Sequence, residues 1–126
     1  MSQSRLRVVT VTDNNFAQTI LDLFVASHDD FVLVGEARDN AAAIKVAGQS
    51  QPDVLLMNLT LLALNGIDTI RQLKLQNPQL RIILLTAEHD PERLHAALGA
   101  GADVYLPQFT LSAKLAETIQ RVRQLT

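Results

Sequence analysis

Polar side chains that could take part in chemistry follow the ends of four short apolar segments of the chain. In chain order they are Thr12 and Asp13, then Asn58, Thr86 and Gln108. Asp13 supplies the only carboxylate of the set, and the others offer neutral hydroxyl and amide groups. Because Mg²⁺ is held mainly by carboxylate oxygens, we expect weak metal binding at best. Thr12, Asn58 and Gln108 are therefore predicted to form neutral hydrogen bonds and not a catalytic centre.

Five short apolar segments predict the strands that must position these side chains. They cover residues 6–11, 31–34, 54–59, 82–85 and 104–106. Most are continuously apolar, which is typical of a parallel sheet that is covered on both faces. Helical periodicity lies between them, so strand and helix alternate along the chain. Short connections and right-handed crossovers then predict an α/β fold with an open, doubly wound sheet.

The first helix has an apolar stripe that we expect to face the sheet. Phe16, Ile20, Leu23 and Phe24 fall at i, i+4, i+7 and i+8. Ala17, Leu21 and Val25 widen the stripe. A wide stripe suits burial against a sheet.

The other helices are marked by their ends or their periodicity. Residues 40–49 are alanine-rich, and a third helix is predicted to stop near Asn77 and Pro78. Asp90 can cap the fourth, with Pro91 in its first turn and Gly101 at its end. Thr110 can cap the last helix. Its repeating apolar positions are Leu111, Leu115, Ile119 and Val122. In such folds ligands collect at the carboxyl ends of the strands, where the polar set above lies.

Composition limits the class of protein. The 126 residues suit one domain, 1–126. A formal net charge of -2 leaves no basic excess for nucleic acid or for a membrane surface. The start of the chain lacks the features of a signal peptide, no apolar run is long enough to cross a membrane, and there is no cysteine. We therefore predict a soluble, cytoplasmic protein.

Other chemical motifs are missing from the sequence. It has no Gly-rich phosphate loop, no ordered Ser, His and Asp set, and no paired carboxylates elsewhere. His28, His89 and His95 are far apart and are predicted to be solvated surface residues, not a metal triad.

Several motifs resemble one known family. They are Pro52-Asp53-Val54-Leu55-Leu56, Asn65-Gly66, Leu84-Leu85-Thr86-Ala87 and the segment Gly99-Ala100-Gly101-Ala102-Asp103-Val104-Tyr105-Leu106-Pro107. In this order and spacing the chain resembles the receiver domain of bacterial two-component response regulators over nearly its full length. Residues 31–37 look most like receivers that precede LuxR-type DNA-binding domains. The resemblance implies a flavodoxin-like (βα)5 fold with strand order 2-1-3-4-5.

The resemblance also implies roles for the polar set. Receivers accept a phosphoryl group from a kinase histidine on an aspartate that ends strand three, with Mg²⁺ held by two acids that end strand one. Asn58 occupies the nucleophile position, Thr12 and Asp13 the acidic pair, and Gln108 the position of a lysine. Thr60 lies in the same degenerate site.

Two further positions match the family's switch pair. Thr86 corresponds to the hydroxyl that moves toward the phosphoryl group, and Tyr105 to the ring that turns inward. Simple packing at a strand end and a sheet edge is the alternative for both residues.

These substitutions predict a pseudo-receiver that signals through protein contacts without aspartyl phosphorylation. The expected partner is a protein, such as a histidine kinase or an output domain. A homodimer through helix four, strand five and helix five is a further expectation. Two alternatives stay open, namely the N-terminal domain of a LuxR-type transcription regulator and a small-ligand sensor. The apolar loop 61–64 is predicted either to fill the altered site or to form a contact patch.

Overall fold

The computed structural model describes residues 5–58, 65–87, 89–107 and 113–124. Its strands are β1 (Leu6–Val11), β2 (Phe31–Ala37), β3 (Val54–Asn58), β4 (Arg81–Thr86) and β5 (Val104–Pro107). Its helices are α1 (Asn15–Ala26), α2 (Asn40–Ser50), α3 (Gly66–Gln76), α4 (Pro91–Ala100) and α5 (Ala113–Arg123). Strand and helix alternate along the whole chain, as the sequence predicts.

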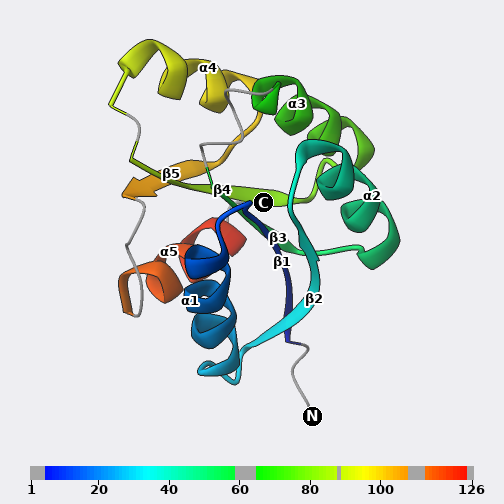
Figure 1. The fold of residues 1–126 in the computed structure, drawn as a ribbon, viewed down its shortest axis with the longest axis vertical. Helices are drawn as coiled ribbons and strands as arrows, with labels where there is room; N and C mark the ends of the chain where they lie inside the picture. Colours follow the sequence, from blue (N-terminus) through cyan, green and yellow to red (C-terminus); the bar gives the residue numbers. More distant parts are fainter. Residues whose placement is uncertain (1–4, 59–64, 88, 108–112, 125–126) are drawn as a thin grey trace.

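The five strands form one parallel sheet in the order β2-β1-β3-β4-β5. Figure 1 shows α1 and α5 on one face of this sheet and α2, α3 and α4 on the other. The predicted doubly wound α/β fold with strand order 2-1-3-4-5 is therefore confirmed. Because every strand is parallel to its neighbours, all their carboxyl ends lie along the same edge.

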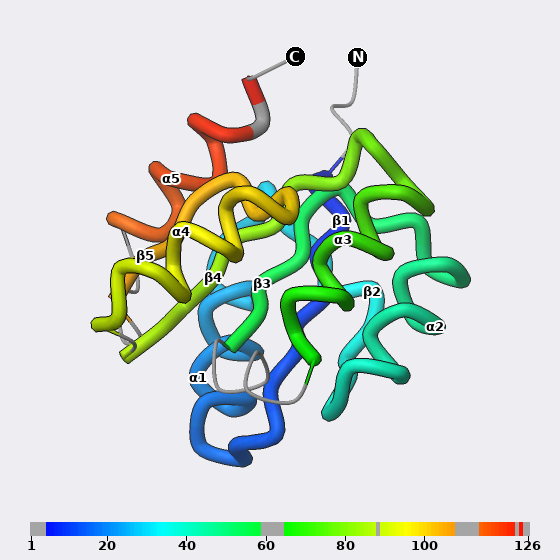
Figure 2. The backbone as a smooth tube through the Cα atoms, turned by 90° about the horizontal axis from the view of Figure 1, so that it is seen from above, coloured from blue at the N-terminus to red at the C-terminus, as the bar shows by residue number. Residues whose placement is uncertain are grey.

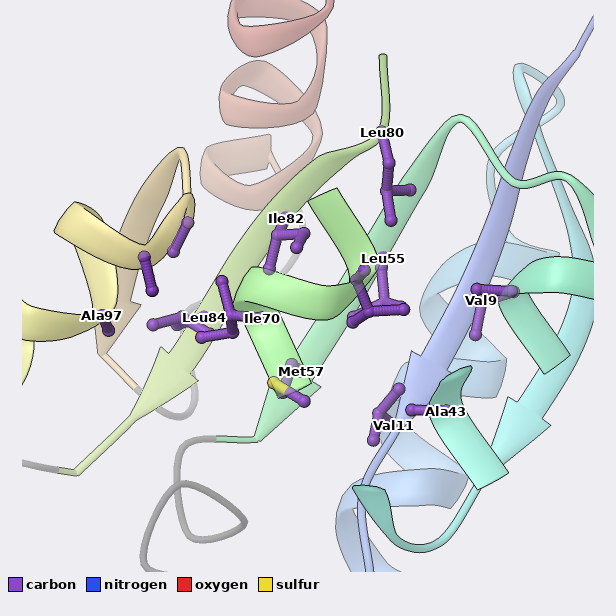
Figure 3. Close-up of a cluster of buried hydrophobic side chains, with 14 of the residues drawn as sticks. Val9, Val11, Ala43, Leu55, Met57, Ile70, Leu80, Ile82, Leu84 and Ala97 are labelled. Carbon is purple, nitrogen blue, oxygen red and sulfur yellow. The ribbon is translucent and has the colours of Figure 1, made fainter. Parts of the chain in front are cut away.

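The core consists of two layers that the central sheet separates. All five residues of β3 are buried, and successive side chains point to opposite faces. Leu55 and Met57 belong to the layer under α2, α3 and α4, as Figure 3 shows, whereas Val54 and Leu56 belong to the layer under α1 and α5. Each fully buried aliphatic side chain of this kind stabilises the fold by roughly 1.5–3 kcal/mol. Burial on both sides explains why this strand is apolar at every position before Asn58.

The face of α1 that meets the sheet differs from the predicted one. Phe16 and Leu23 are 66% and 65% exposed, so their predicted burial is wrong. Phe24 of the predicted stripe is buried, and so are Leu21 and Val25, which are predicted to widen it. Together with Ala17 they repeat at i, i+4, i+7 and i+8, which is the same spacing displaced by one residue. Both stripes have helical periodicity, and contact with the sheet selects the second.

The ring of Phe24 explains part of this selection. It packs at the end of α1 between His28 and Phe31, with ring centroids 4.6 Å and 5.7 Å away. His28 Nδ1 also lies 2.8 Å from the carbonyl oxygen of Phe24. The prediction of a solvated surface histidine is therefore wrong for His28, which is part-buried among aromatic rings.

Helix ends follow the local chemistry of the chain. Asp90 caps α4 by accepting a hydrogen bond from the Glu92 N–H at 3.0 Å, and Pro91 occupies the first turn, as predicted. Gly101 ends the same helix with a φ of 128°, where a side chain would be strained. Asn14 caps α1. The predicted cap Thr110 lies outside the described residues.

Asp103 fastens the start of β5 to β4. Its Oδ2 accepts a hydrogen bond from the Ile82 N–H at 2.8 Å. Lys74 and Arg81 approach the same carboxylate at 3.4 Å and 3.3 Å. These side chains are only 12–20% exposed, so the hydrogen bonds satisfy a carboxylate that is largely removed from water. This arrangement fixes the start of β5, the strand that contains Tyr105.

A polar cluster joins α1 to β1 and β2. Thr10 of β1 lies opposite Glu36 of β2 in the strand register. Gln18 Nε2 donates hydrogen bonds to Thr10 Oγ1 at 2.9 Å and to Asp22 Oδ1 at 2.8 Å. Desolvation raises the pKa of Glu36 above 4.5, and both a hydrogen bond to Asp22 and the charge of that carboxylate raise it further. The Glu36 carboxyl group therefore keeps its proton to a higher pH than an isolated glutamate does, because its pKa is raised.

This carboxyl pair predicts a pH-dependent stability. A raised folded-state pKa means that the contribution of Glu36 is fully present below its unfolded pKa and is lost as the pH rises through the folded value. The Glu36→Gln variant keeps a neutral donor for Asp22 at every pH. We expect its melting temperature relative to the unmodified protein to rise steadily from about pH 4 to about pH 7.

Thermal melts at a series of pH values measure this difference. The Asp29→Asn variant, which removes an exposed carboxylate from the nearby loop, is the control and should show a flat difference. A pH-independent difference for Glu36→Gln would contradict the raised pKa of Glu36.

Candidate functional site

The carboxyl ends of β1, β3 and β4 bring three predicted site residues to one side of the molecule. Figure 2 shows these strands ending on the same side as the start of α1. Thr12, Asn58 and Thr86 follow or end these strands and are 0%, 5% and 6% exposed. Three neutral polar side chains are therefore buried where adjacent strands end.

Thr12 and Asn58 are joined by a hydrogen bond across two neighbouring strands. Asn58 Nδ2 donates to Thr12 Oγ1 at 3.3 Å. The same Oγ1 accepts from the Asn14 N–H at 3.2 Å, and the Thr12 N–H donates to the carbonyl oxygen of Ala37 at 3.1 Å. Thr12 therefore links the ends of β1, β2 and β3 to the turn that begins α1.

Asp13 directly follows Thr12 at this edge of the sheet. It is exposed, and its carbonyl oxygen accepts a hydrogen bond from Arg38 Nη2 at 2.9 Å. Within the described part of the chain, no group of three or more histidine, cysteine or acidic side chains is placed to hold a metal ion. One exposed carboxylate beside a buried amide and hydroxyl does not fit the near-octahedral, oxygen-rich surroundings that Mg²⁺ requires.

Thr86 and Tyr105 lie in β4 and β5, the two strands that follow β3 in the order of the sheet. Thr86 ends β4 and is buried, whereas Tyr105 lies in β5 and is 41% exposed. In the register Tyr105 pairs with Leu84, and Thr86 pairs with Pro107. Whether the two side chains move together stays a prediction.

Most of the described leucine side chains of α4 and α5 lie in the core. Leu94 and Leu115 are buried, and Leu98 is 37% exposed. Thr60, Gln108, Leu111 and the loop 61–64 lie outside the described residues.

Sequence reasoning missed Arg38 as part of the site. It follows β2 directly, and β2 is the neighbour of β1 in the sheet. A residue immediately after the second strand could have been included with the other strand-end residues. Its guanidinium donates a hydrogen bond to the backbone carbonyl oxygen of Asp13 and so joins the end of β2 to the residue that follows Thr12.

The fold and the position of the site define the class of protein. Five parallel strands in the order β2-β1-β3-β4-β5, covered by helices on both faces, form a flavodoxin-like receiver fold whose polar site lies at the strand ends. The family model described as "Response regulator receiver domain" matches residues 8–120. The chain belongs to this family, whose members are signalling modules.

Individual relatives are similar over nearly the whole chain. This chain is 30% identical over 122 residues to the nitrate/nitrite response regulator protein homolog of Haemophilus influenzae. The match covers 97% of this chain and 59% of the relative. Three of the curated relatives are longer than this chain, which spans 54–59% of their length.

Solved structures show the same fold. The signal receiver domain of the putative response regulator NarL from Mycobacterium tuberculosis has a TM-score of 0.89 at 21% identity, with 97% of this chain and 98% of that chain covered. CheY6 from R. sphaeroides, solved in complex with the P1 domain of CheA3, has a TM-score of 0.80 at 20% identity, with 94% and 97% covered. No described helix of this chain has the length and apolar character of a membrane span.

The Thr12–Asn58 hydrogen bond predicts a cost for removing the hydroxyl. The Thr12→Val variant has nearly the same shape but removes the hydroxyl that accepts from the Asn58 amide and from the Asn14 N–H. We expect the free energy of unfolding to fall by about 1–3 kcal/mol, because the hydrogen bonds of a fully buried hydroxyl are lost. Denaturant unfolding measures this change.

The control is Thr19→Val on α1, where an exposed hydroxyl donates to the carbonyl oxygen of Asn15 at 3.1 Å. It should change the free energy of unfolding by less than about 0.5 kcal/mol. Equal effects of the two substitutions would argue against a stabilising Thr12–Asn58 contact.

Proposed function

We propose that this chain is a pseudo-receiver, which signals through protein contacts and does not form an aspartyl phosphate. One observation carries the proposal. Asn58 stands at the end of β3, where the resemblance places the phosphate-accepting aspartate, and its buried amide is a hydrogen-bond donor to Thr12. The side chain that should attack phosphorus is instead part of a neutral internal contact.

The chemistry of Asn58 supports this proposal. Formation of an acyl phosphate requires a carboxylate oxygen as nucleophile, and an amide oxygen is a poor one. Phosphoryl transfer also depends on positioned charge around the three phosphoryl oxygens. Thr12 in the acidic pair and Gln108 in place of the lysine remove two of the charges that the family uses.

The remaining charges support the same conclusion. Three carboxylates in one pocket repel each other unless a cation is bound. Here Asp13 is the only one of these acids, and it is exposed next to Arg38. The site therefore holds together without Mg²⁺, and any binding of this ion is weak.

Acetyl phosphate gives a direct test of the missing nucleophile. Incubation with acetyl phosphate and Mg²⁺ should leave the intact mass of the protein unchanged. A stoichiometric gain of one phosphoryl group that hydroxylamine removes would refute the proposal.

Two variants make this result interpretable. Asn58→Asp restores the nucleophile alone, and we expect slow or no phosphoryl gain, because the other charges are still missing. Adding Thr12→Asp and Gln108→Lys should give a detectable gain if the fold tolerates the charges. Uptake by the unmodified protein at another residue would be separated from these cases by peptide mass analysis.

Magnesium titration tests the metal part of the proposal. A ligand that binds only the folded protein stabilises it more as its concentration rises above its dissociation constant, so an ion that binds weakly produces almost no change. Millimolar Mg²⁺ should leave the melting temperature nearly unchanged. The Thr12→Asp, Asn58→Asp variant should show a rise of several degrees, and a similar rise in the unmodified protein would mean that Asp13 already anchors a metal site.

The expected partner is another protein. Receivers are signalling modules, and CheY6, of similar fold, was solved in complex with another protein domain, the P1 domain of CheA3. A histidine kinase or an output domain is therefore the partner class that we propose, with homodimerisation through α4, β5 and α5 as a second form of contact. Leu98 and Tyr105 are exposed on that side of the molecule. Binding to nucleic acid by this domain itself is not proposed, and a cytoplasmic location follows from this role.

A second candidate function rests on the length of the relatives. Because the chain spans only 54–59% of the first curated relatives, it could be the N-terminal domain of a LuxR-type regulator. A continuous reading frame with a helix-turn-helix pattern after residue 126 would decide for this function.

A further inference from the structure

A cavity of about 340 Å³ opens between the start of α4 and strand β5. Figure 1 shows the start of α4, the end of β4 and strand β5 on the same side of the molecule. Its lining residues are Thr86, His89, Pro91, Leu94, Tyr105, Leu106 and Pro107. The cavity is therefore next to the strand-end site but does not include Thr12, Asp13 or Asn58.

The lining combines apolar walls with a few polar groups. Pro91, Leu94, Leu106 and Pro107 are apolar, whereas Thr86, His89 and Tyr105 offer a hydroxyl, an imidazole and a phenol. Small-molecule sites are typically concave, mostly apolar, and carry a small number of polar groups that fix orientation. The composition of this lining matches that description.

The charges of the lining restrict the class of ligand. None of the seven lining residues is an aspartate, glutamate, lysine or arginine. An ion that entered would lose hydration without gaining a fixed opposite charge, and that is costly. A neutral molecule is favoured over a phosphate or a carboxylate.

The size and shape of the cavity restrict the ligand further. Its volume is near the lower end of the range of about 300–1,000 Å³ for small-molecule sites. Tyr105 contributes a flat ring, against which another aromatic ring can stack or pack edge to face. One ring with a single polar group suits this space better than a nucleotide does.

We propose that this cavity binds a small neutral aromatic molecule with one hydrogen-bonding group, and that the bound molecule holds Tyr105 at the surface. The consequence for signalling rests on the proposed function, because a domain without aspartyl phosphorylation needs another input. Tyr105 is 41% exposed and lies on the face proposed for partner contacts, so its position links the cavity to that face. Thr86 connects the cavity to the strand-end site.

Benzamide and benzoate are matched probes for this proposal, because they have nearly the same shape and differ in charge. Each is titrated into ¹⁵N-labelled protein without phosphate or Mg²⁺. Benzamide should shift the amide signals of Thr86, Leu94 and Leu106 in a saturable manner, and benzoate should not. No benzamide shift, equal shifts with benzoate, or shifts only elsewhere would overturn the proposal.

Variants at two exposed positions test the location. Tyr105→Ala removes one wall and should weaken benzamide binding about tenfold or more. Leu98→Ala is the control, because Leu98 has similar exposure at 37% and does not line the cavity, so binding should be unchanged. Equal effects of the two variants would overturn the assignment.

Filling the cavity gives an independent test. Leu94→Phe places extra volume inside and should abolish the benzamide shifts while a thermal melt still shows a folded protein. If this variant does not fold, Tyr105→Ala decides the question alone. Phosphoryl uptake from acetyl phosphate would refute the proposed function without altering these titrations, so the two failures are distinguishable.

Discussion

The side-chain amide of Asn58 is almost completely buried, and a buried amide must find its hydrogen bonds inside the protein. The parallel sheet imposes this requirement, because β3 is covered on both faces and delivers its last side chain into the same edge as β1 and β4. Thr12, which follows the neighbouring strand β1, accepts a hydrogen bond from this amide. Hydrogen bonds to the backbone of β2 and from the following turn hold Thr12 in place. Neutral hydrogen bonds of Thr12 thus link the ends of three strands to the start of α1.

This neutral contact also distinguishes the site from a receiver site that has a carboxylate at position 58. A carboxylate at position 58 would need a nearby cation, whereas an amide needs only an acceptor and a donor of ordinary strength. Asp13 turns outward and meets Arg38 through its backbone. The residues around the site are therefore consistent with each other, because a neutral amide at position 58 meets a neutral hydroxyl at position 12.

The strands and the site could be predicted from sequence because both depend on short-range patterns. Continuous apolar segments revealed the buried sheet, and the residues directly after them gave Thr12, Asn58 and Thr86. The burial of α1 could not be assigned in the same way, because two stripes displaced by one residue have the same period and only contact with the sheet distinguishes them.

The raised pKa of Glu36 next to Asp22 escaped sequence reasoning for a different reason. Those residues are far apart in the chain, and their contact depends on the register that places Thr10 opposite Glu36. The cavity beside Tyr105 depends similarly on how α4 packs over β4 and β5, which no local pattern records. Sequence patterns thus predicted the positions of strand ends better than they predicted which side chains meet across elements.

Strand β5 ends the sheet opposite β2, and it has only four residues, the last of which is Pro107. An outer strand normally presents N–H and C=O groups that can pair with a strand from another chain. Proline has no N–H, and a strand this short offers few groups before it ends. The residue that completes one wall of the cavity therefore also limits the addition of foreign strands, which protects this edge from aggregation while leaving the ring of Tyr105 at the surface.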